Sequence, residues 1–414
     1  MKRIHFIGIG GIGVSSLAQY YLAQGWRVSG SDAAKSEITD DLKKRGVKIF
    51  IGQKASNIKS PNLIVYSAAI KPDNPEFSQA VTKGYPLLSY AQAVGELTKK
   101  YFTIAVSGSH GKSTTTALVG LILVEAGLDP TIIIGTKLKE LGDTNFRLGQ
   151  SQHLILEADE YAKSFHNYFP KIAVVTNIDK EHLDIYKNLA GVLNGFKKFF
   201  RNVSRGGYIV ANKEDANIKK ILSTSDVDII WYKKGQHKLS IPGVHNQFNA
   251  EAAWQAVKLL GVKKSIAEKV FKKYQGAWRR MELLSHNIYS DYAHHPTEIK
   301  ATLQALGEKY PQKSLVCVFQ PHQQDRLNRL FQEFKLAFKE ADKTILYPLY
   351  KVKGRDTTGK TSQDLAQAIN KHNVFYADNF KEVLSFIKTD LKSDSIIAFM
   401  SAGDLDLQIR KFLA

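Results

Sequence analysis

The sequence predicts an α/β protein with three domains. Apolar, strand-like runs alternate with helical patterns almost throughout the 414 residues, and this alternation is typical of parallel sheets covered by helices. A chain of this length exceeds one ordinary hydrophobic core. We expect the domains to span residues 1–98, 99–278 and 279–414.

The first domain opens with a strand that leads into a glycine-rich turn. A strand-like run at residues 4–7 precedes Gly8-Ile9-Gly10-Gly11-Ile12-Gly13, a helical pattern follows, and a second strand ends at Asp32. This spacing is typical of a Rossmann-like domain, in which the glycines admit a diphosphate and the acid reaches a ribose. The loop fits NAD or the diphosphate of a nucleotide sugar, and a merely structural turn is the third interpretation.

The central domain carries a second anion-binding loop. A strand at residues 102–106 enters Ser107-Gly108-Ser109-His110-Gly111-Lys112-Ser113-Thr114, and a helical pattern leaves it. Free N–H groups at the helix start favour phosphate, Lys112 suits the terminal phosphates, and the Ser113 hydroxyl suits magnesium. The loop has Val106 where the usual pattern begins with glycine. We expect a P-loop ATPase-like domain that binds ATP and Mg²⁺.

The third domain repeats the strand–helix alternation. Strand-like runs occur at residues 314–319, 344–346 and 396–400, so we expect a second Rossmann-like domain there. The lone cysteine, Cys317, lies in the first of these runs, where burial in the core is expected. One cysteine permits no disulfide within the chain, which fits a reducing compartment.

The composition favours small anionic partners. The net charge is +19, but the lysines are scattered in pairs rather than gathered with aromatic residues in a dense tract. A basic surface around small-molecule sites is therefore a better interpretation than nucleic-acid binding. We find no signal peptide and no apolar stretch long enough to cross a bilayer, so we expect a cytoplasmic protein without membrane insertion.

Further motifs resemble, in the same order, those of the Mur ligases of bacterial cell-wall synthesis. They are the loop at residues 108–116, Glu157-Ala158-Asp159-Glu160-Tyr161, and the segments at residues 176–184, 243–250, 279–282 and 291–298. The resemblance spans nearly the whole chain. It implies an ATP-dependent ligase that activates a carboxylate as an acyl phosphate and joins it to an amine.

Within that family, the pattern is most similar to the branch that joins L-alanine to UDP-N-acetylmuramate. The run Phe319-Gln320-Pro321-His322 is one pointer, although Gln323 stands where the family usually has arginine. A sister branch that recycles a murein tripeptide shares many of the motifs. The resemblance assigns the nucleotide sugar to these residues: Gly8, Gly10, Gly11, Gly13, Asp32 and Ser67.

The resemblance also implies the catalytic and nucleotide-binding residues. The catalytic group is Lys112, Glu157, His182 and Arg280. Ser113 with Glu157, and Glu157 with His182, would each hold a magnesium ion, although histidine is an unusual ligand for this cation. The remaining ATP contacts would be Gly108, Ser109, His110, Gly111, Thr114, His245, Asn246, Asn249 and Asp291. His294 and His295 would lie on the side where the third domain closes over the amino acid.

Plainer roles remain open for several of these residues. Ser67 fits a capping serine as well as a nucleotide contact. His245 and Asn246 also fit a helix cap and its neighbour, and His182 fits a surface loop. Asp159 and Glu160 fit acid helpers or solvated carboxylates. At the level of the whole chain, an NAD-dependent oxidoreductase and a nucleic-acid-stimulated ATPase are the rival classes. We expect a monomer or a homodimer.

Overall fold

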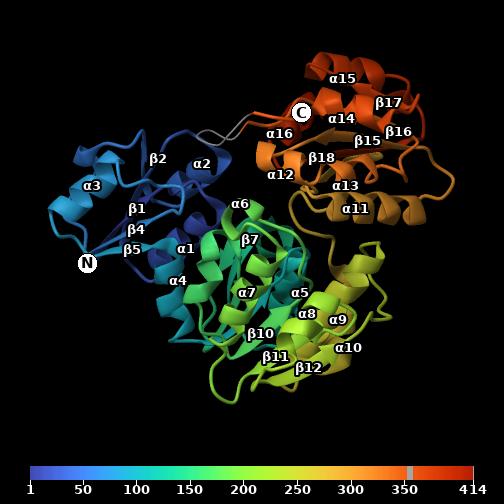
Figure 1. Ribbon diagram of the computed structural model, residues 1–414. Coiled ribbons are helices and arrows are strands. Elements are labelled where there is room, and N and C mark those ends of the chain that lie inside the picture. Colours follow the sequence, from blue (N-terminus) through green and yellow to red (C-terminus); the bar gives the residue numbers. More distant parts are fainter. Residues whose placement is uncertain (352–357, 414) are drawn as a thin grey trace. The chain divides into compact units, whose positions relative to one another are not determined.

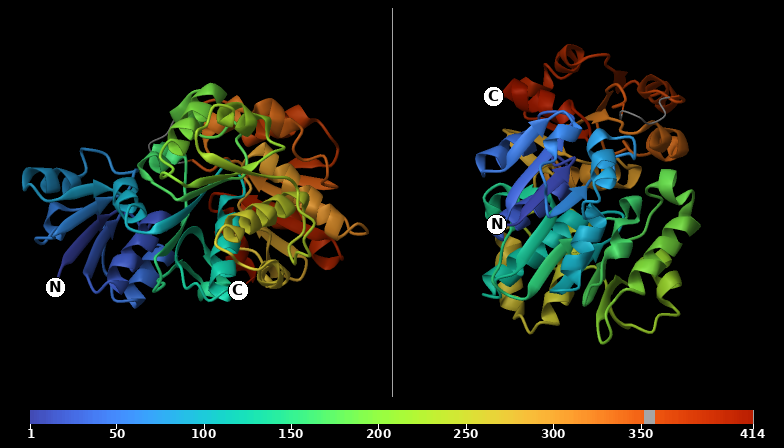
Figure 2. Two further views of the ribbon diagram at one scale, coloured as in Figure 1. Left: turned by 90° about the horizontal axis from the view of Figure 1, so that it is seen from below. Right: turned by 90° about the vertical axis from the view of Figure 1, so that its left-hand side faces the viewer.

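The computed structural model describes residues 1–351 and 358–413. Its fold contains three sheets (Figures 1 and 2), which confirms the predicted α/β class. The chain forms two compact units: Met1–His237 with Phe248–Lys272, and Lys238–Gln247 with Lys273–Ala414. The first unit holds two of the sheets and the second unit holds the third. The domain boundaries near residues 98 and 278 stay a prediction.

The first sheet has five parallel strands in the order β3-β2-β1-β4-β5. Its strand order reverses between β1 and β4, and such a switch point is where open α/β sheets bind ligands. The glycine turn follows β1, and Ser67 follows β4, where its N–H donates to the Ile7 carbonyl at 2.9 Å. The elements are β1 (Arg3–Ile7), α1 (Ile12–Ala23), β2 (Arg27–Asp32), α2 (Glu37–Lys44), β3 (Lys48–Ile51), β4 (Leu63–Tyr66), α3 (Pro75–Thr82), β5 (Leu87–Ser89) and α4 (Tyr90–Thr98).

The second sheet has seven strands in the order β12-β11-β10-β6-β9-β7-β8, and β8 alone runs antiparallel among the described pairings of this sheet. The phosphate loop follows β6, at the centre of the sheet, and β9 and β10 flank it. The elements are β6 (Phe102–Ser107), α5 (Lys112–Glu125), β7 (Thr131–Leu138), β8 (Thr144–Arg147), β9 (His153–Glu157), β10 (Ile172–Val175), α6 (Leu183–Tyr186), α7 (Leu189–Phe200), β11 (Tyr208–Asn212), α8 (Ala216–Leu222), β12 (Asp228–Tyr232), α9 (Val244–Lys258) and α10 (Lys264–Lys273).

The third sheet has six strands in the order β13-β14-β18-β15-β16-β17. Cys317 lies in its strand β15 and is fully buried, as predicted. The elements are β13 (Glu282–Ser285), β14 (Ile288–Asp291), α11 (Pro296–Lys309), β15 (Leu315–Gln320), α12 (Gln324–Arg329), α13 (Phe331–Lys335), β16 (Lys343–Leu346), α14 (Ser362–Ile369), β17 (Val374–Tyr376), α15 (Phe380–Phe386), β18 (Ile396–Ser401) and α16 (Leu405–Leu413). Of the helices described, none has the length and apolar character to cross a membrane.

A buried histidine joins two helices beside the second sheet. The side chain of His237 is 2 % exposed and contacts Glu251 of α9 at 2.7 Å and Glu268 of α10 at 2.9 Å. Burial alone would lower the pKa of His237, but the hydrogen bonds to the two glutamates outweigh it and raise that pKa. For Glu251, burial alone would raise the pKa, but the hydrogen bond to His237 outweighs burial, and the pKa of Glu251 is lowered.

This cluster predicts a pH-dependent contribution to stability. The raised pKa means that His237 stabilises the fold fully below about pH 6.5, the unfolded value, and loses that effect as pH rises through its folded pKa. Glu251 stabilises the fold fully above about pH 4.3, the unfolded value, and loses that effect as pH falls through its lowered folded pKa. We expect His237→Gln to cost about 2 kcal/mol near pH 6 and less above pH 8. Thermal unfolding across pH measures this, with the exposed His286→Gln as a control; equal losses at both pH values would contradict it.

Candidate active site

The phosphate loop turns sharply between β6 and α5, and two glycines make the turn possible. Gly108 has φ +136° and Gly111 has φ +81°, a region that residues with a Cβ rarely adopt. An added Cβ would lie 2.0 Å from Oγ1 of Thr176 at Gly108, and 2.3 Å from Oδ1 of Asn249 at Gly111. The N-cap residue of α5 is Gly111, which has no side chain to cap the helix. The first N–H groups of α5 are therefore suited to binding an anion.

The segment after β10 holds the loop in place. Asn177 donates from its side chain to the His110 carbonyl at 3.0 Å and accepts from the His110 N–H at 2.9 Å. Ser109 Oγ accepts from the Asp179 N–H at 2.8 Å, and the Asp179 carboxylate lies 3.2 Å from the His110 ring. His110 and Ser109 were predicted as ATP contacts, and here they also fix the shape of the loop. The motif at residues 176–184 was recognised in the sequence, but this supporting role of Asn177 and Asp179 was not.

Lys112 begins α5, and its ammonium folds back over the loop. Nζ donates to the Gly108 carbonyl at 2.7 Å and lies 2.9 Å and 3.2 Å from the two carboxylate oxygens of Glu160. Burial would lower the pKa of Lys112, but the charge of Glu160 outweighs it and raises that pKa. Lys112 is therefore a fixed positive charge at the loop. Thr114 lies two residues further along α5 and is buried.

The first predicted pair of magnesium ligands lies together. Ser113 Oγ donates to Oε1 of Glu157 at 3.0 Å, and the other carboxylate oxygen accepts from the Gly135 N–H at 2.8 Å. Glu157 ends β9, and Ser113 is the second residue of α5, the helix that follows the neighbouring strand β6. A serine hydroxyl and a carboxylate are oxygen ligands of the kind that Mg²⁺ prefers, so these residues fit the cation.

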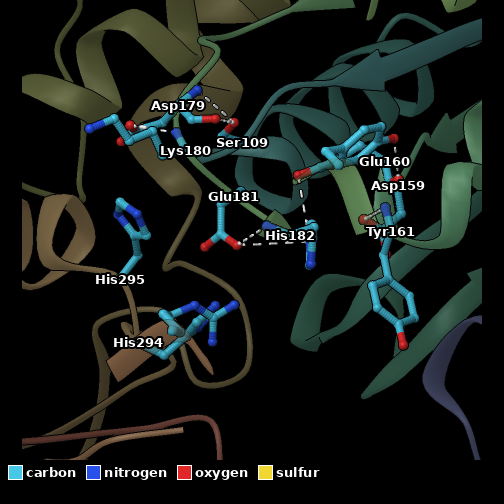
Figure 3. Close-up of polar contacts among 12 residues, drawn as sticks. Ser109, Asp159, Glu160, Tyr161, Asp179, Lys180, Glu181, His182, His294 and His295 are labelled. Carbon is cyan, nitrogen blue, oxygen red and sulfur yellow. Dashed lines mark hydrogen bonds and ion pairs between the residues drawn. The ribbon is translucent and has the colours of Figure 1, made fainter. Parts of the chain in front are cut away.

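The second group differs in part from the predicted one. The atoms that the structure gathers around His182 belong to Asp159 and Glu160, all within 4.8 Å of one another (Figure 3), whereas the sequence paired His182 with Glu157. His182 has φ +51°, and its Nδ1 is buried without a hydrogen-bond partner among the described residues. The other ring nitrogen, Nε2, lies 3.8 Å from Oε1 of Glu160, so this group offers nitrogen and oxygen ligands to a cation. Glu160 is fully buried, so its interpretation as a solvated carboxylate is wrong.

Hydrogen bonds from the end of β2 hold the glycine turn of the first sheet. The backbone carbonyl of Ser31 accepts from the N–H groups of Gly8 and Ile9 at 2.8 and 2.9 Å, and the carboxylate of Asp32 accepts from the Gly10 N–H at 2.8 Å. Asp32 was predicted to reach a ribose, and in this structure it fixes the turn. Gly11 caps α1 without a side chain, which leaves the start of α1 as the part of the turn suited to a diphosphate.

A pocket of about 210 Å³ joins the glycine turn to the acid at the end of β9. Both lie in the first unit. Gly11 and Gly13 line it on one side, Glu157 on another, and the side chains of Tyr90 and Tyr161 contribute aromatic walls. Ser67 also lines it, while its hydroxyl accepts from the Ala69 N–H at 3.3 Å as a turn cap. Neither tyrosine was predicted as a site residue, although Tyr161 ends the motif at residues 157–161.

Gly11 offers a test of this pocket that separates binding from folding. An added Cβ would find its nearest atom at 3.6 Å, the Gly8 carbonyl oxygen, so Gly11→Ala fits the protein without strain. Because Gly11 lines the pocket, we expect it to weaken binding of UDP-N-acetylmuramate about tenfold with an unchanged unfolding temperature. Calorimetry with UDP-N-acetylmuramate and with NAD measures this. Gly307→Ala, at an open position, is the control, and unchanged affinity in Gly11→Ala would contradict the assignment.

Two adjacent arginines in the second unit have different surroundings. Arg279 is buried, donates to the carbonyls of Ser401 and Gly403, and lies 3.4 Å from Asp406. The side chain of Arg280 is 31 % exposed and lies 3.8 Å from Glu298. Arg279 is thus part of the folded framework. Arg280, the predicted catalytic residue, is partly exposed, and its guanidinium lies 5.1 Å from the centroid of the Tyr292 ring.

Asp291 supports the backbone of the second unit. Its oxygens accept from the N–H groups of Met281 and Ala293, each at 2.7 Å, and burial raises its pKa to about 6. His295 is the N-cap of α11 and accepts from the Thr297 N–H at 3.3 Å, and His294 bonds to the Tyr292 carbonyl at 2.9 Å. Within this unit, Asp291, His294 and His295 therefore form hydrogen bonds to the backbone that support the fold. Their predicted roles toward ATP and the amino acid stay proposals.

The remaining predicted residues lie on α9. His245 and Asn246 stand in its first turn, where Asn246 donates to the Pro242 carbonyl at 2.6 Å. Burial lowers the pKa of His245 to about 4, so its ring is neutral at pH 7 and suited to hydrogen bonding rather than to charge. Asn249, within the first unit, lies directly against Gly111.

Three family models match the chain in succession. They are the Mur ligase family catalytic domain at residues 3–102, the Mur ligase middle domain at residues 106–252, and the glutamate ligase domain of Mur ligases at residues 279–403. The chain therefore belongs to the Mur ligase family, as its motifs predicted.

Relatives within the family carry more specific names. The UDP-N-acetylmuramate–L-alanine ligase of Alkaliphilus metalliredigens is 38 % identical over 100 % of this chain and 97 % of its own length. That of Acetivibrio thermocellus is 40 % identical over 98 % and 94 %. The crystal structure of the corresponding Thermotoga maritima ligase matches with a TM-score of 0.83 and 27 % identity, covering 100 % of this chain and 98 % of the other. A murein peptide ligase from Psychrobacter arcticus, at 23 % identity and a TM-score of 0.74, shares the fold.

Proposed function

We propose that this protein is an ATP-dependent ligase that joins L-alanine to the carboxylate of UDP-N-acetylmuramate through an acyl phosphate. The observation that carries the proposal is the pocket shared by the glycine turn and Glu157. It would hold a nucleotide sugar with its acid end toward the phosphate loop. The names of the relatives at 38–40 % identity support the choice of substrates.

The residues divide the chemistry among them. A carboxylate is a poor electrophile, so the γ-phosphate of ATP is transferred to it, and an acyl phosphate and ADP form. The amine of L-alanine then attacks the acyl carbon, an amide forms, and phosphate leaves. Lys112 and the loop amides would bind the phosphates, where positive charge stabilises the transferred group.

Magnesium, when bound, would add positive charge near the phosphates. Ser113 and Glu157 would hold it at the loop, and His182 with its neighbouring carboxylates would hold a second ion. Arg280, His294 and His295 are proposed to act from the second unit, and His245, Asn246, Asn249 and Asp291 to contribute to the ATP site. We propose a cytoplasmic monomer or homodimer that acts on small-molecule substrates.

Two alternatives are less well supported. A ligase that recycles a murein tripeptide would use the same chemistry, but the relative of that kind cited above matches at lower identity. An oxidoreductase would bind NAD at the glycine turn. The pocket there is also lined by Glu157, which lies beside the phosphate loop, and an oxidoreductase has no use for that second loop.

Phosphate release is the direct test. We expect release only when ATP, UDP-N-acetylmuramate and L-alanine are all present, with glycine slower and a tripeptide poor, because the amine must attack a specific acyl phosphate. A simple ATPase would release phosphate without either substrate. Equal release with and without the amine would contradict the ligase, and preference for a tripeptide would move the protein to the recycling branch.

A further inference from the structure

Glu160 is a buried carboxylate of the group around His182, and it also contacts the ammonium of Lys112. Its side chain is 0 % exposed, and both its oxygens lie within 3.2 Å of the Lys112 ammonium. The backbone carbonyl of Glu160 accepts from the Tyr186 hydroxyl at 2.7 Å, which fixes this residue from the other side. A carboxylate in such a place requires a charged partner, and Lys112 supplies it.

The contacts of Lys112 occupy all the hydrogen-bond donors of its ammonium. An ammonium has three N–H groups, and Nζ contacts the Gly108 carbonyl at 2.7 Å, the Ser109 carbonyl at 3.3 Å and the Glu160 carboxylate at 2.9 Å. A phosphate that reaches Lys112 must therefore displace one of these partners. Glu160 is the anion among them, so it competes directly with phosphate for the same cation.

We propose that Glu160 is a positioning residue that holds Lys112 against its own loop until the phosphates of ATP replace the carboxylate. The proposal rests on the proposed binding of ATP at this loop. Part of the free energy of ATP binding is then used to separate Lys112 from Glu160. The loop therefore binds ATP more weakly than it would if Lys112 were not paired with a carboxylate. His182 Nε2 lies 3.8 Å from Oε1 of Glu160 and offers the displaced carboxylate a second partner.

A double-mutant cycle on the full chain tests this, with ATP binding measured by calorimetry in EDTA. Glu160→Gln keeps the size and a hydrogen-bond acceptor but removes the charge, and we expect ATP to bind about tenfold more tightly. Lys112→Ala should weaken binding. In the Lys112→Ala background, Glu160→Gln should change affinity by less than about twofold, because the competition no longer exists. A merely structural role would give weaker binding, so the sign is diagnostic.

The remaining outcomes separate this inference from the proposed function. Unchanged or weaker ATP binding in Glu160→Gln overturns the inference, and so does equal tightening in both backgrounds. If Lys112→Ala leaves ATP binding unchanged, the proposed ATP site itself fails and the inference falls with it. Where Glu160→Gln does not fold, Glu160→Asp shortens the carboxylate while keeping its charge. A smaller tightening then supports the proposal, and weaker or unchanged binding overturns it.

Discussion

Lys112→Ala is expected to lower phosphate release by about a thousandfold, because a fixed cation aimed at a transferred phosphoryl group contributes strongly to catalysis. Its ammonium is the positive side chain that the structure places on the loop between β6 and α5. The substitution should also destabilise the fold, because removal of Lys112 leaves Glu160 buried without its cation.

The measurement therefore needs two readouts. Thermal unfolding reports the cost of the unpaired carboxylate, which is about 3 kcal/mol when it stays charged. The double variant Lys112→Ala with Glu160→Gln removes both charges, so it should regain stability without regaining activity. Lys83→Ala, at an exposed lysine that caps the end of α3, controls for loss of a charge. Phosphate release near the parent rate in a folded Lys112→Ala protein would reject Lys112 as the catalytic cation.

Gly111→Ala is expected to abolish ATP binding and to destabilise the protein by about 3 kcal/mol or more. Two costs add: a left-handed backbone at φ +81°, and a Cβ only 2.3 Å from Oδ1 of Asn249. Either the loop opens or Asn249 moves away, and both displace the start of α5.

Gly127 supplies a matched control for the backbone cost. It has φ +75°, and an added Cβ there would meet no atom within 4 Å. Gly127→Ala should cost about 1 kcal/mol and leave ATP affinity unchanged. Calorimetry and thermal unfolding of both variants isolate the effect of Asn249. If the two variants behave alike, the contact between Gly111 and Asn249 has no role in the site.

Local pattern was sufficient for the elements that surround the site. The runs at residues 4–7 and 102–106 were predicted as strands from local pattern, and they form most of β1 and most of β6. The glycine turn and the phosphate loop were predicted from spacing, since a tight turn requires glycine wherever φ is positive. Ser113 and Glu157 were linked through the family resemblance, and they lie 3.0 Å apart.

Short edge strands were harder to predict. The strands β13 and β17 have four and three residues with partly exposed side chains, so neither shows a continuous apolar run. Such strands depend on the neighbours to which they pair, and that pairing is long-range along the chain. The same holds for Tyr90 and Tyr161, which line the pocket from separate elements.

By itself, the sequence determined the α/β class, the positions of the two glycine-rich loops and the family, because each depends on residues close together along the chain. The tertiary structure alone decided which charges meet. Glu160 could be a solvated carboxylate in the sequence, but burial and the nearness of Lys112 make it an ion-pair partner. Asp32 has the spacing of a ribose ligand, yet it bonds to Gly10. The reason is physical: a charge buried on folding must find its partner wherever the packing places one.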